Sequence, residues 1–157
     1  MQYTLADLLN IEHIQAGIEA RHAEDAIERL TAGLVDTGHA TPEFAGDVLD
    51  REAVYPTGLP TQPFAVAIPH ADPDHVLKSA VAVGTLVSPV KFGQMGTDGS
   101  TTLDVSIIFL LAIKEKEKQV EMIQQLIGLI QTPKLLDALS KAKSPAEALA
   151  LIHTILR

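Results

Sequence analysis

The middle of this chain carries three apolar runs in which apolar and polar residues do not alternate. The runs span residues 64–68, 80–87 and 103–113, and small and β-branched side chains dominate them. A strand with one face in water alternates between apolar and polar residues, whereas a strand covered on both faces is apolar throughout. We therefore expect three strands of a sheet that is sandwiched between helices on both faces.

Helical patterns lie on both sides of these runs. Apolar residues recur at helical spacing over 21–37, where Gly38 supplies a stop, and again over 117–131. Thr4 and Asp7 resemble a capping box for a short first helix. Further helix starts are predicted at Thr41-Pro42-Glu43, for a helix reaching Arg51 or Glu52, and at Thr132-Pro133 and Ser144-Pro145.

The two segments between these elements are rich in proline and glycine. "AVYPTGLPTQPF", residues 53–64, predicts a loop of fixed shape rather than a helix or a strand. "SPVKFGQMGTDGS", residues 88–100, predicts a short strand or bend followed by a turn. The predicted order is helices, strands, helices. The fold class is α/β, with a mixed β-sheet between two helical layers in a single domain over residues 1–157.

Composition excludes several classes of function. The formal net charge of −8 argues against a nucleic-acid-binding surface, which is usually basic. Cysteine is absent, which excludes disulfides, thiolate nucleophiles and cysteine metal ligands. The N-terminal residues lack the pattern of a signal peptide, and no apolar run is long enough to span a bilayer. We expect a soluble, cytoplasmic domain without membrane insertion.

The stretch "FAVAIPHADPDHV", residues 64–76, places a histidine directly after a buried strand. Pro69 extends the preceding residue and removes an amide donor, so His70 follows on a stiff exit. A neutral imidazole is a nucleophile at pH 7 when one ring nitrogen is free and a hydrogen bond holds the other. An attacked phosphoryl group also needs cationic donors, and Arg51 is the nearest preceding arginine.

Other interpretations of the same residues stay open at this point. His70 can belong to an ordinary polar loop, and Arg51 can form a surface ion pair. "HADPDH" supplies two imidazoles and two carboxylates that zinc accepts, so a metal-binding domain using His70 and His75 is a lesser alternative. Against it, Pro73 stiffens the loop and no second ligand pair is evident.

"DREAVYPTG" followed by "AVAIPHA" resembles the type-2 enzyme IIA (EIIA) domain of the bacterial phosphoenolpyruvate-dependent sugar phosphotransferase system (PTS). That family has an Arg-Glu pair, a Thr-Gly and an (Ile/Leu)-Pro-His in this order, and "SPVKFG" resembles its Pro-Val-x-Phe segment. The resemblance covers nearly the whole chain. It implies that His70 accepts phosphate beside Arg51, and that Thr57 and Gly58 bind phosphate in the loop that walls the site.

Two departures from the fructose- and mannitol-type pattern resemble the galactitol-specific EIIA instead. The gap from Arg51 to His70 is longer, at 70 − 51 = 19 residues. Gln119 stands where those members carry a second active-site histidine, and a further histidine, His75, follows His70 by five residues. The resemblance implies that His75 replaces the missing histidine. Gln119 is the alternative for that position.

The function that the resemblance implies is a phosphocarrier enzyme. His70 would accept a phosphoryl group from the carrier protein HPr and pass it to a cysteine of a IIB component. The IIB component would phosphorylate a sugar alcohol, such as galactitol, that enters through a membrane IIC permease. No metal or organic cofactor is needed, and Leu59, Pro60 and Phe64 are expected in the docking rim. The alternative is a nitrogen-type regulatory EIIA that signals by binding proteins.

Overall fold

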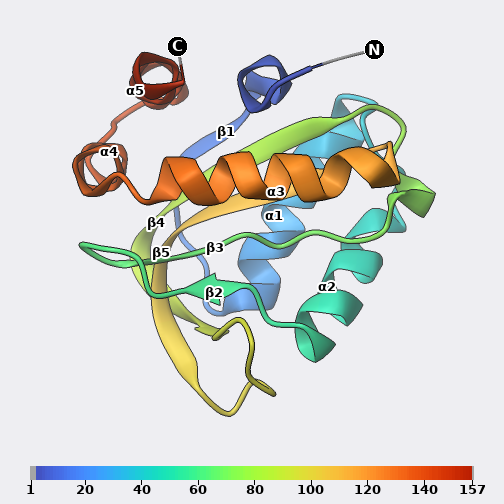
Figure 1. Ribbon diagram of the computed structural model, residues 1–157, viewed down its shortest axis with the longest axis horizontal. Coiled ribbons are helices and arrows are strands. Elements are labelled where there is room, and N and C mark those ends of the chain that lie inside the picture. The colour runs from blue at the N-terminus through green and yellow to red at the C-terminus, as the bar shows by residue number, and fades with distance from the viewer. Residues whose placement is uncertain (1–2, 157) are drawn as a thin grey trace.

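A five-stranded mixed sheet forms the centre of the computed structural model, which describes residues 3–156 (Figure 1). The strand order is β1-β4-β5-β3-β2. The β1–β4 and β5–β3 pairs are parallel, whereas the β4–β5 and β3–β2 pairs are antiparallel. The strands are β1 (Leu9–Ile18), β2 (Gly58–Leu59), β3 (Ala65–Ala67), β4 (Ala80–Gly93) and β5 (Thr102–Ala112).

Helices cover both faces of this sheet, as predicted. In Figure 1, α3 crosses in front of the sheet and α1 lies behind it. One core contains side chains from α1 and α2, and the other contains side chains from α3, α4, α5 and the first 3₁₀ turn. The helices are α1 (Ala23–Asp36), α2 (Phe44–Val54), α3 (Lys116–Ile130), α4 (Pro133–Ser140) and α5 (Pro145–Ile155), with 3₁₀ turns η1 (Leu5–Leu8) and η2 (Pro73–His75).

Strand β5 explains why the apolar runs do not alternate. Ile107 and Phe109 pack into the core under α3, whereas Ile108 and Leu110 pack into the core under α1 and α2. Successive side chains of a strand point to opposite faces, and here both faces are buried. The predicted α/β sandwich is therefore confirmed.

The predicted order of helices, strands and helices is wrong at its start, because β1 precedes α1. The strand was missed because Asn10, Glu12 and other polar residues interrupt its apolar pattern. It lies at the edge of the sheet, paired with β4, so part of it faces solvent and can be polar. A second correction concerns residues 53–64, which contain the short strand β2 and are not all loop. A third is the length of β4, which continues to Gly93.

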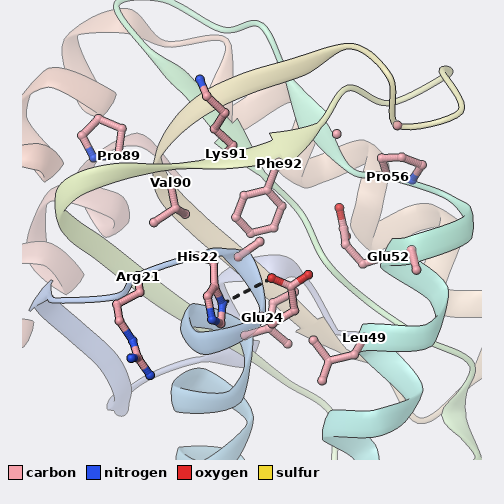
Figure 2. Close-up of a pocket in the computed structure, with 15 residues that line it drawn as sticks. Arg21, His22, Glu24, Leu49, Glu52, Pro56, Pro89, Val90, Lys91 and Phe92 are labelled. Carbon is pink, nitrogen blue, oxygen red and sulfur yellow. Dashed lines mark ion pairs between the residues drawn. The ribbon is translucent and has the colours of Figure 1, made fainter.

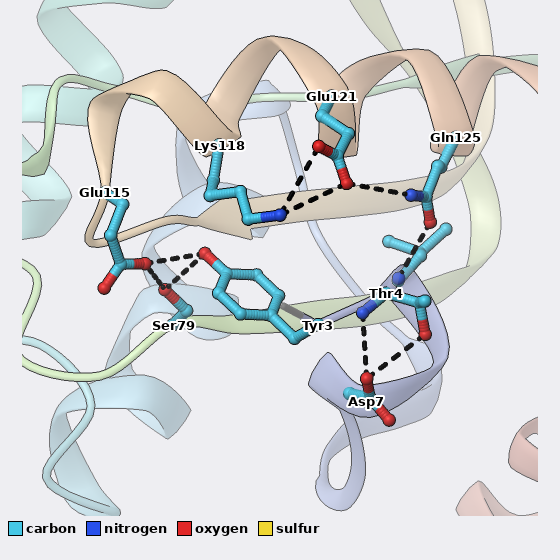
Figure 3. Close-up of polar contacts among 9 residues, drawn as sticks. Tyr3, Thr4, Asp7, Ser79, Glu115, Lys118, Glu121 and Gln125 are labelled. Atoms are coloured by element: carbon cyan, nitrogen blue, oxygen red, sulfur yellow. Dashed lines mark hydrogen bonds and ion pairs between the residues drawn. The ribbon is translucent and has the colours of Figure 1, made fainter. Parts of the chain in front are cut away.

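Helix ends follow the predicted signals in part. The Asp7 carboxylate accepts hydrogen bonds from the Thr4 amide, at 2.8 Å, and from the Thr4 hydroxyl (Figure 3), but the element is a single 3₁₀ turn. Gly38, at φ 78°, follows α1 as expected. Helix α2 begins at Phe44 instead of Pro42, since the Phe44 amide donates to the Thr41 carbonyl in a preceding turn.

The N-terminal turn is fastened to α3, the helix that forms one side of the candidate site. The Leu5 amide donates to the Gln125 side chain at 2.9 Å, and the Tyr3 hydroxyl donates to Glu115 at 2.7 Å (Figure 3). These bonds hold both the start and the middle of α3. Within residues 3–156, no helix is long and apolar enough to cross a membrane.

Candidate active site

His70 lies between the end of β3 at Ala67 and the 3₁₀ turn η2. Pro69 cannot donate a hydrogen bond, but its carbonyl accepts one from the Leu111 amide of β5 at 3.0 Å. His70 itself forms an isolated bridge with Leu111. His70 is therefore still held by the sheet, and the residue is only 7% exposed.

Two features keep the His70 imidazole neutral and oriented. The Nδ1 atom lies 2.8 Å from the Ile68 carbonyl oxygen, which can only accept, so Nδ1 carries the proton. Nε2 is then the unprotonated, nucleophilic nitrogen. Burial lowers the pKa of His70, and the positive charge of Arg51 lowers it further, while the bond to Ile68 acts in the opposite direction. The ring is therefore ready to attack an electrophile through Nε2.

Arg51 contributes a cation from the last turn of α2. Its guanidinium lies over the ring of Tyr55, with Cζ 5.2 Å from the ring centroid. The Nε atom of Arg51 is buried and has no hydrogen-bond partner among the described residues. No Asp or Glu within residues 3–156 forms an ion pair with it, so the surface-ion-pair alternative is not supported.

His70 and Arg51 line the same cavity, of about 570 Å³. The end of α2 and the loop 55–57 form one side of this cavity, and the turn 95–98 and Ile123 of α3 also line it. Thr57 lines it as well. An unprotonated nitrogen, an unpaired guanidinium and an open volume suit a transferable anionic group such as a phosphoryl group.

Thr57 is held by the carboxylate of Glu52. The Thr57 amide and hydroxyl both donate to Glu52, each at 2.8 Å, and Thr57 is buried, with 2% of the residue exposed. Burial raises the pKa of Glu52, although the bonds from Thr57 oppose that change. Glu52 therefore fixes the loop between α2 and β2, a role that sequence reasoning missed. The spacing of the Arg-Glu pair before Thr-Gly was its only signal.

Gly58 lets two backbone segments approach closely. A Cβ atom on Gly58 would lie 2.6 Å from the Gly93 carbonyl oxygen. The Gly58 carbonyl accepts a hydrogen bond from the Met95 amide at 2.8 Å. The turn 95–98 is thereby joined to β2 at the cavity wall, which sequence reasoning did not foresee. The place of Tyr55 at the cavity was also not predicted from the sequence. The glycines at 93, 96 and 99 were the available signal for the turn.

The structure does not bring His75 to the cavity that His70 lines. Its Nδ1 atom forms a hydrogen bond and ion pair with Asp47 of α2 instead. Gln119 is 9% exposed, and its side-chain amide donates to the Ala71 carbonyl at 2.8 Å, directly after His70. Neither residue lines the cavity, and each holds the segment that follows His70.

A second cavity, of about 390 Å³, is lined by Arg21, Lys91 and Glu52 among others, and its His22–Glu24 ion pair is drawn in Figure 2. None of the predicted site residues lines it. Within the described part of the chain, no group of three or more His, Cys, Asp or Glu side chains could hold a metal ion. The metal-binding alternative therefore has no support in this geometry.

The sequence matches a known protein family over nearly its whole length. The profile of the family described as "Phosphoenolpyruvate-dependent sugar phosphotransferase system, EIIA 2" matches residues 7–154. The chain belongs to this EIIA family. EIIA components are phosphotransferases with a phosphohistidine intermediate, and the chain is an enzyme of this class.

The chain is also similar to two curated proteins of different description. It is 28% identical to the transcriptional regulator ManR of Bacillus subtilis over 78% of this chain, and the match spans only 18% of ManR. It is 24% identical to the galactitol-specific EIIA component of Escherichia coli over 80% of its length, and spans 83% of that protein.

Two solved structures share the fold of this EIIA. The crystal structure of the mannitol IIA of Escherichia coli has a TM-score of 0.75 and 26% identity, with 91% of this chain and 97% of that chain covered. The complex of enzyme IIAMTL with phosphorylated enzyme IIBMTL of Escherichia coli also has a TM-score of 0.75, with 27% identity and coverage of 94% and 99%. PTS IIA domains thus pair with IIB components.

Proposed function

We propose that this EIIA carries phosphate on His70, between the phosphohistidine of HPr and a cysteine of a IIB component, during uptake of a sugar alcohol. The observation that carries the proposal is the tautomer of His70. Its Nδ1–H is committed to the Ile68 carbonyl, so Nε2 is unprotonated at a cavity that the unpaired Arg51 guanidinium also lines.

The proposed transfer is a pair of in-line displacements. The Nε2 lone pair of His70 forms a bond to phosphorus as the phosphorus–nitrogen bond of the HPr phosphohistidine breaks, and that electron pair returns to the HPr imidazole. The second displacement forms a phosphorus–sulfur bond to the IIB thiolate and restores the Nε2 lone pair. Arg51 balances the charge on the phosphoryl oxygens, and the Ile68 carbonyl stabilises the ring when it becomes cationic.

Apolar side chains around the cavity support docking of protein partners. Val54, Tyr55 and Val120 are each more than 60% exposed, at 62%, 63% and 62%, and the first two line the His70 cavity. Leu59 and Pro60, predicted for this rim, do not line the His70 cavity but line a separate groove with Ile127. Ile127 lies one helical turn after Ile123, which lines the His70 cavity. Phe64, also predicted for the rim, is partly buried against the core under α3.

The substrate class rests on the galactitol-specific relative and on the loop that lengthens the interval from Arg51 to His70. A second candidate function, a regulatory EIIA, is favoured by a different observation, the similarity to the regulator ManR. Both functions use the same phosphohistidine. They differ in whether the phosphoryl group leaves for a IIB component.

The test is a two-stage transfer with labelled, phosphorylated HPr. The wild-type chain should become labelled, whereas His70→Ala should remain folded and unlabelled, because His70 is the one histidine among the described residues that line this cavity. His153→Ala, which removes an exposed histidine of α5, is the matched control and should be labelled like the wild type. Label on His70→Ala would refute the assignment of the acceptor.

The second stage offers the labelled chain purified IIB components of galactitol and mannitol systems. We expect faster transfer to the galactitol-type component. Faster transfer to the mannitol-type component would refute the galactitol proposal and keep the phosphocarrier function. A labelled chain that transfers to neither component would favour the regulatory function.

A further inference from the structure

The His75–Asp47 pair joins the two segments that supply the candidate site. His75 ends the 3₁₀ turn η2 in the segment that follows His70, and its Nδ1 bonds to the Asp47 carboxylate on α2. Asp47 precedes Arg51 by four residues on the same helix. Residues four apart lie on one face of a helix, so the pair meets α2 on the face that carries Arg51.

The surroundings of this pair place it between α2 and the His70 segment. Asp47, Arg51, Ala71 and Asp72 line one surface cavity, so the helix and the segment lie opposite each other there. Two other hydrogen bonds hold the segment that follows His70. The Thr41 amide donates to the His75 carbonyl at 3.0 Å, and the Gln119 side-chain amide donates to the Ala71 carbonyl. The side-chain bond to Asp47 adds a direct link to the helix of Arg51.

The charges that face His75 are all negative. Asp47 lies on α2, Glu43 at the N-terminal cap of α2, and Asp74 in the same loop as His75. The hydrogen bond from His75 to Asp47 raises the pKa of His75 above its usual range, and the attraction of the three carboxylates acts in the same direction. Folding therefore shifts the protonation equilibrium of His75 toward the imidazolium form.

We propose that the His75–Asp47 pair is a positioning clamp that holds the loop after His70 against α2, so that Nε2 of His70 stays aligned with the guanidinium of Arg51. This role rests on the proposed phosphoryl transfer through His70. It assigns His75 to orientation of the site and not to contact with the phosphoryl group.

The clamp has a signature in the pH dependence of transfer. Below its lowered pKa, His70 becomes protonated and transfer falls on the acid side. Above its raised pKa, His75 becomes neutral and its attraction to Asp47 weakens, so transfer falls on the alkaline side. The profile should be bell-shaped, with the alkaline limb belonging to the clamp.

The experiment measures the rate of labelling by phosphorylated HPr between about pH 5 and pH 9. His75→Ala and Asp47→Asn should each slow labelling by roughly tenfold or more near pH 7, because small misplacements of reacting groups are costly. The double variant should be no slower than either single variant, because both changes remove one interaction. His75→Ala should also lose the alkaline limb and keep the acid limb.

Asp50→Asn is the matched control, since it removes one carboxylate from the same helix and has no bond to His75. It should label at the wild-type rate. If His75→Ala is labelled at the same rate as Asp50→Asn, the proposed clamp is wrong. It is also wrong if a slowed His75→Ala keeps the wild-type alkaline limb.

A second measurement separates the clamp from the proposed function. Side-chain NMR should give His75 a pKa above the usual 6.5 in the wild type and a lower pKa in Asp47→Asn, but not in Asp50→Asn. Amide exchange over residues 71–76 should speed up in Asp47→Asn. If the wild type accepts no phosphate, the proposed function fails, while these two results still confirm or refute the link between the loop and α2.

Discussion

Replacing Gly58 with alanine tests how the wall of the cavity is built. The new Cβ would lie 2.6 Å from the Gly93 carbonyl oxygen. This oxygen belongs to the backbone, so it cannot move away as the end of a flexible side chain could. Strand β2 is paired with Ala67, and the Gly58 carbonyl is bonded to Met95, so neither side can move alone. We expect overpacking to lower the free energy of unfolding by about 1–3 kcal/mol, which lowers the melting temperature by roughly 2–12 °C for a chain of this length.

Gly128→Ala is the matched control, because Gly128 lies inside α3 with no atom within 4 Å of an added Cβ. That substitution should raise the free energy of unfolding by about 0.5–1 kcal/mol, as for other exposed helix glycines. Urea unfolding gives both values, and labelling by phosphorylated HPr gives the rate. Gly58→Ala should label more slowly because the turn 95–98 moves.

If Gly58→Ala unfolds with the same free energy as the wild type, the close approach of Gly58 and Gly93 does not restrict position 58 to glycine. If that stable variant also accepted no phosphate, Gly58 would instead have the direct phosphate-binding role predicted from the sequence.

Two further predictions concern the end of α2. Arg51→Ala should keep the fold and slow labelling by about 10²-fold, the usual cost of losing one charge-stabilising donor, and an unchanged rate would remove Arg51 from the site. Burial raises the pKa of Glu52 above its usual 4.5, so the folded chain binds this proton more tightly than the unfolded chain does. The free energy of unfolding should therefore fall as pH rises from about 4.5 through that raised pKa, and Glu52→Gln should lose this fall in urea titrations. The same pH dependence in both proteins would contradict the assignment.

The layers of the fold were predictable because burial on both faces leaves a direct mark on sequence. Residues 103–113 are apolar at almost every position, and the structure places alternate side chains in two separate cores. Strand β1 left no such mark, since an edge strand tolerates polar residues. Its place beside β4 depends on a parallel pairing across more than 60 residues of chain, which local patterns do not encode.

The candidate site was predictable where a motif marks it and obscure where tertiary contacts build it. His70 follows a buried strand and Pro69, which is visible in sequence. His75 was expected beside His70 because the two are five residues apart, but its partner is Asp47, 28 residues earlier on another element. Sequence proximity limits how far apart two side chains can be, but it does not fix the direction in which either one points.

The position of Gln119 bears on why a second histidine is not required for the proposed transfer. In the tautomer fixed by Ile68, the attacking Nε2 of His70 carries no proton. The leaving group is also a ring nitrogen that needs no protonation by a neighbouring acid when its own second nitrogen carries a proton. Phosphoryl transfer between two imidazoles therefore depends on alignment and charge balance rather than on general acid or base catalysis. A glutamine that donates to the Ala71 carbonyl can hold His70 in position as well as an imidazole could. We therefore expect Gln119→Ala to change the rate of labelling by phosphorylated HPr only by moving His70.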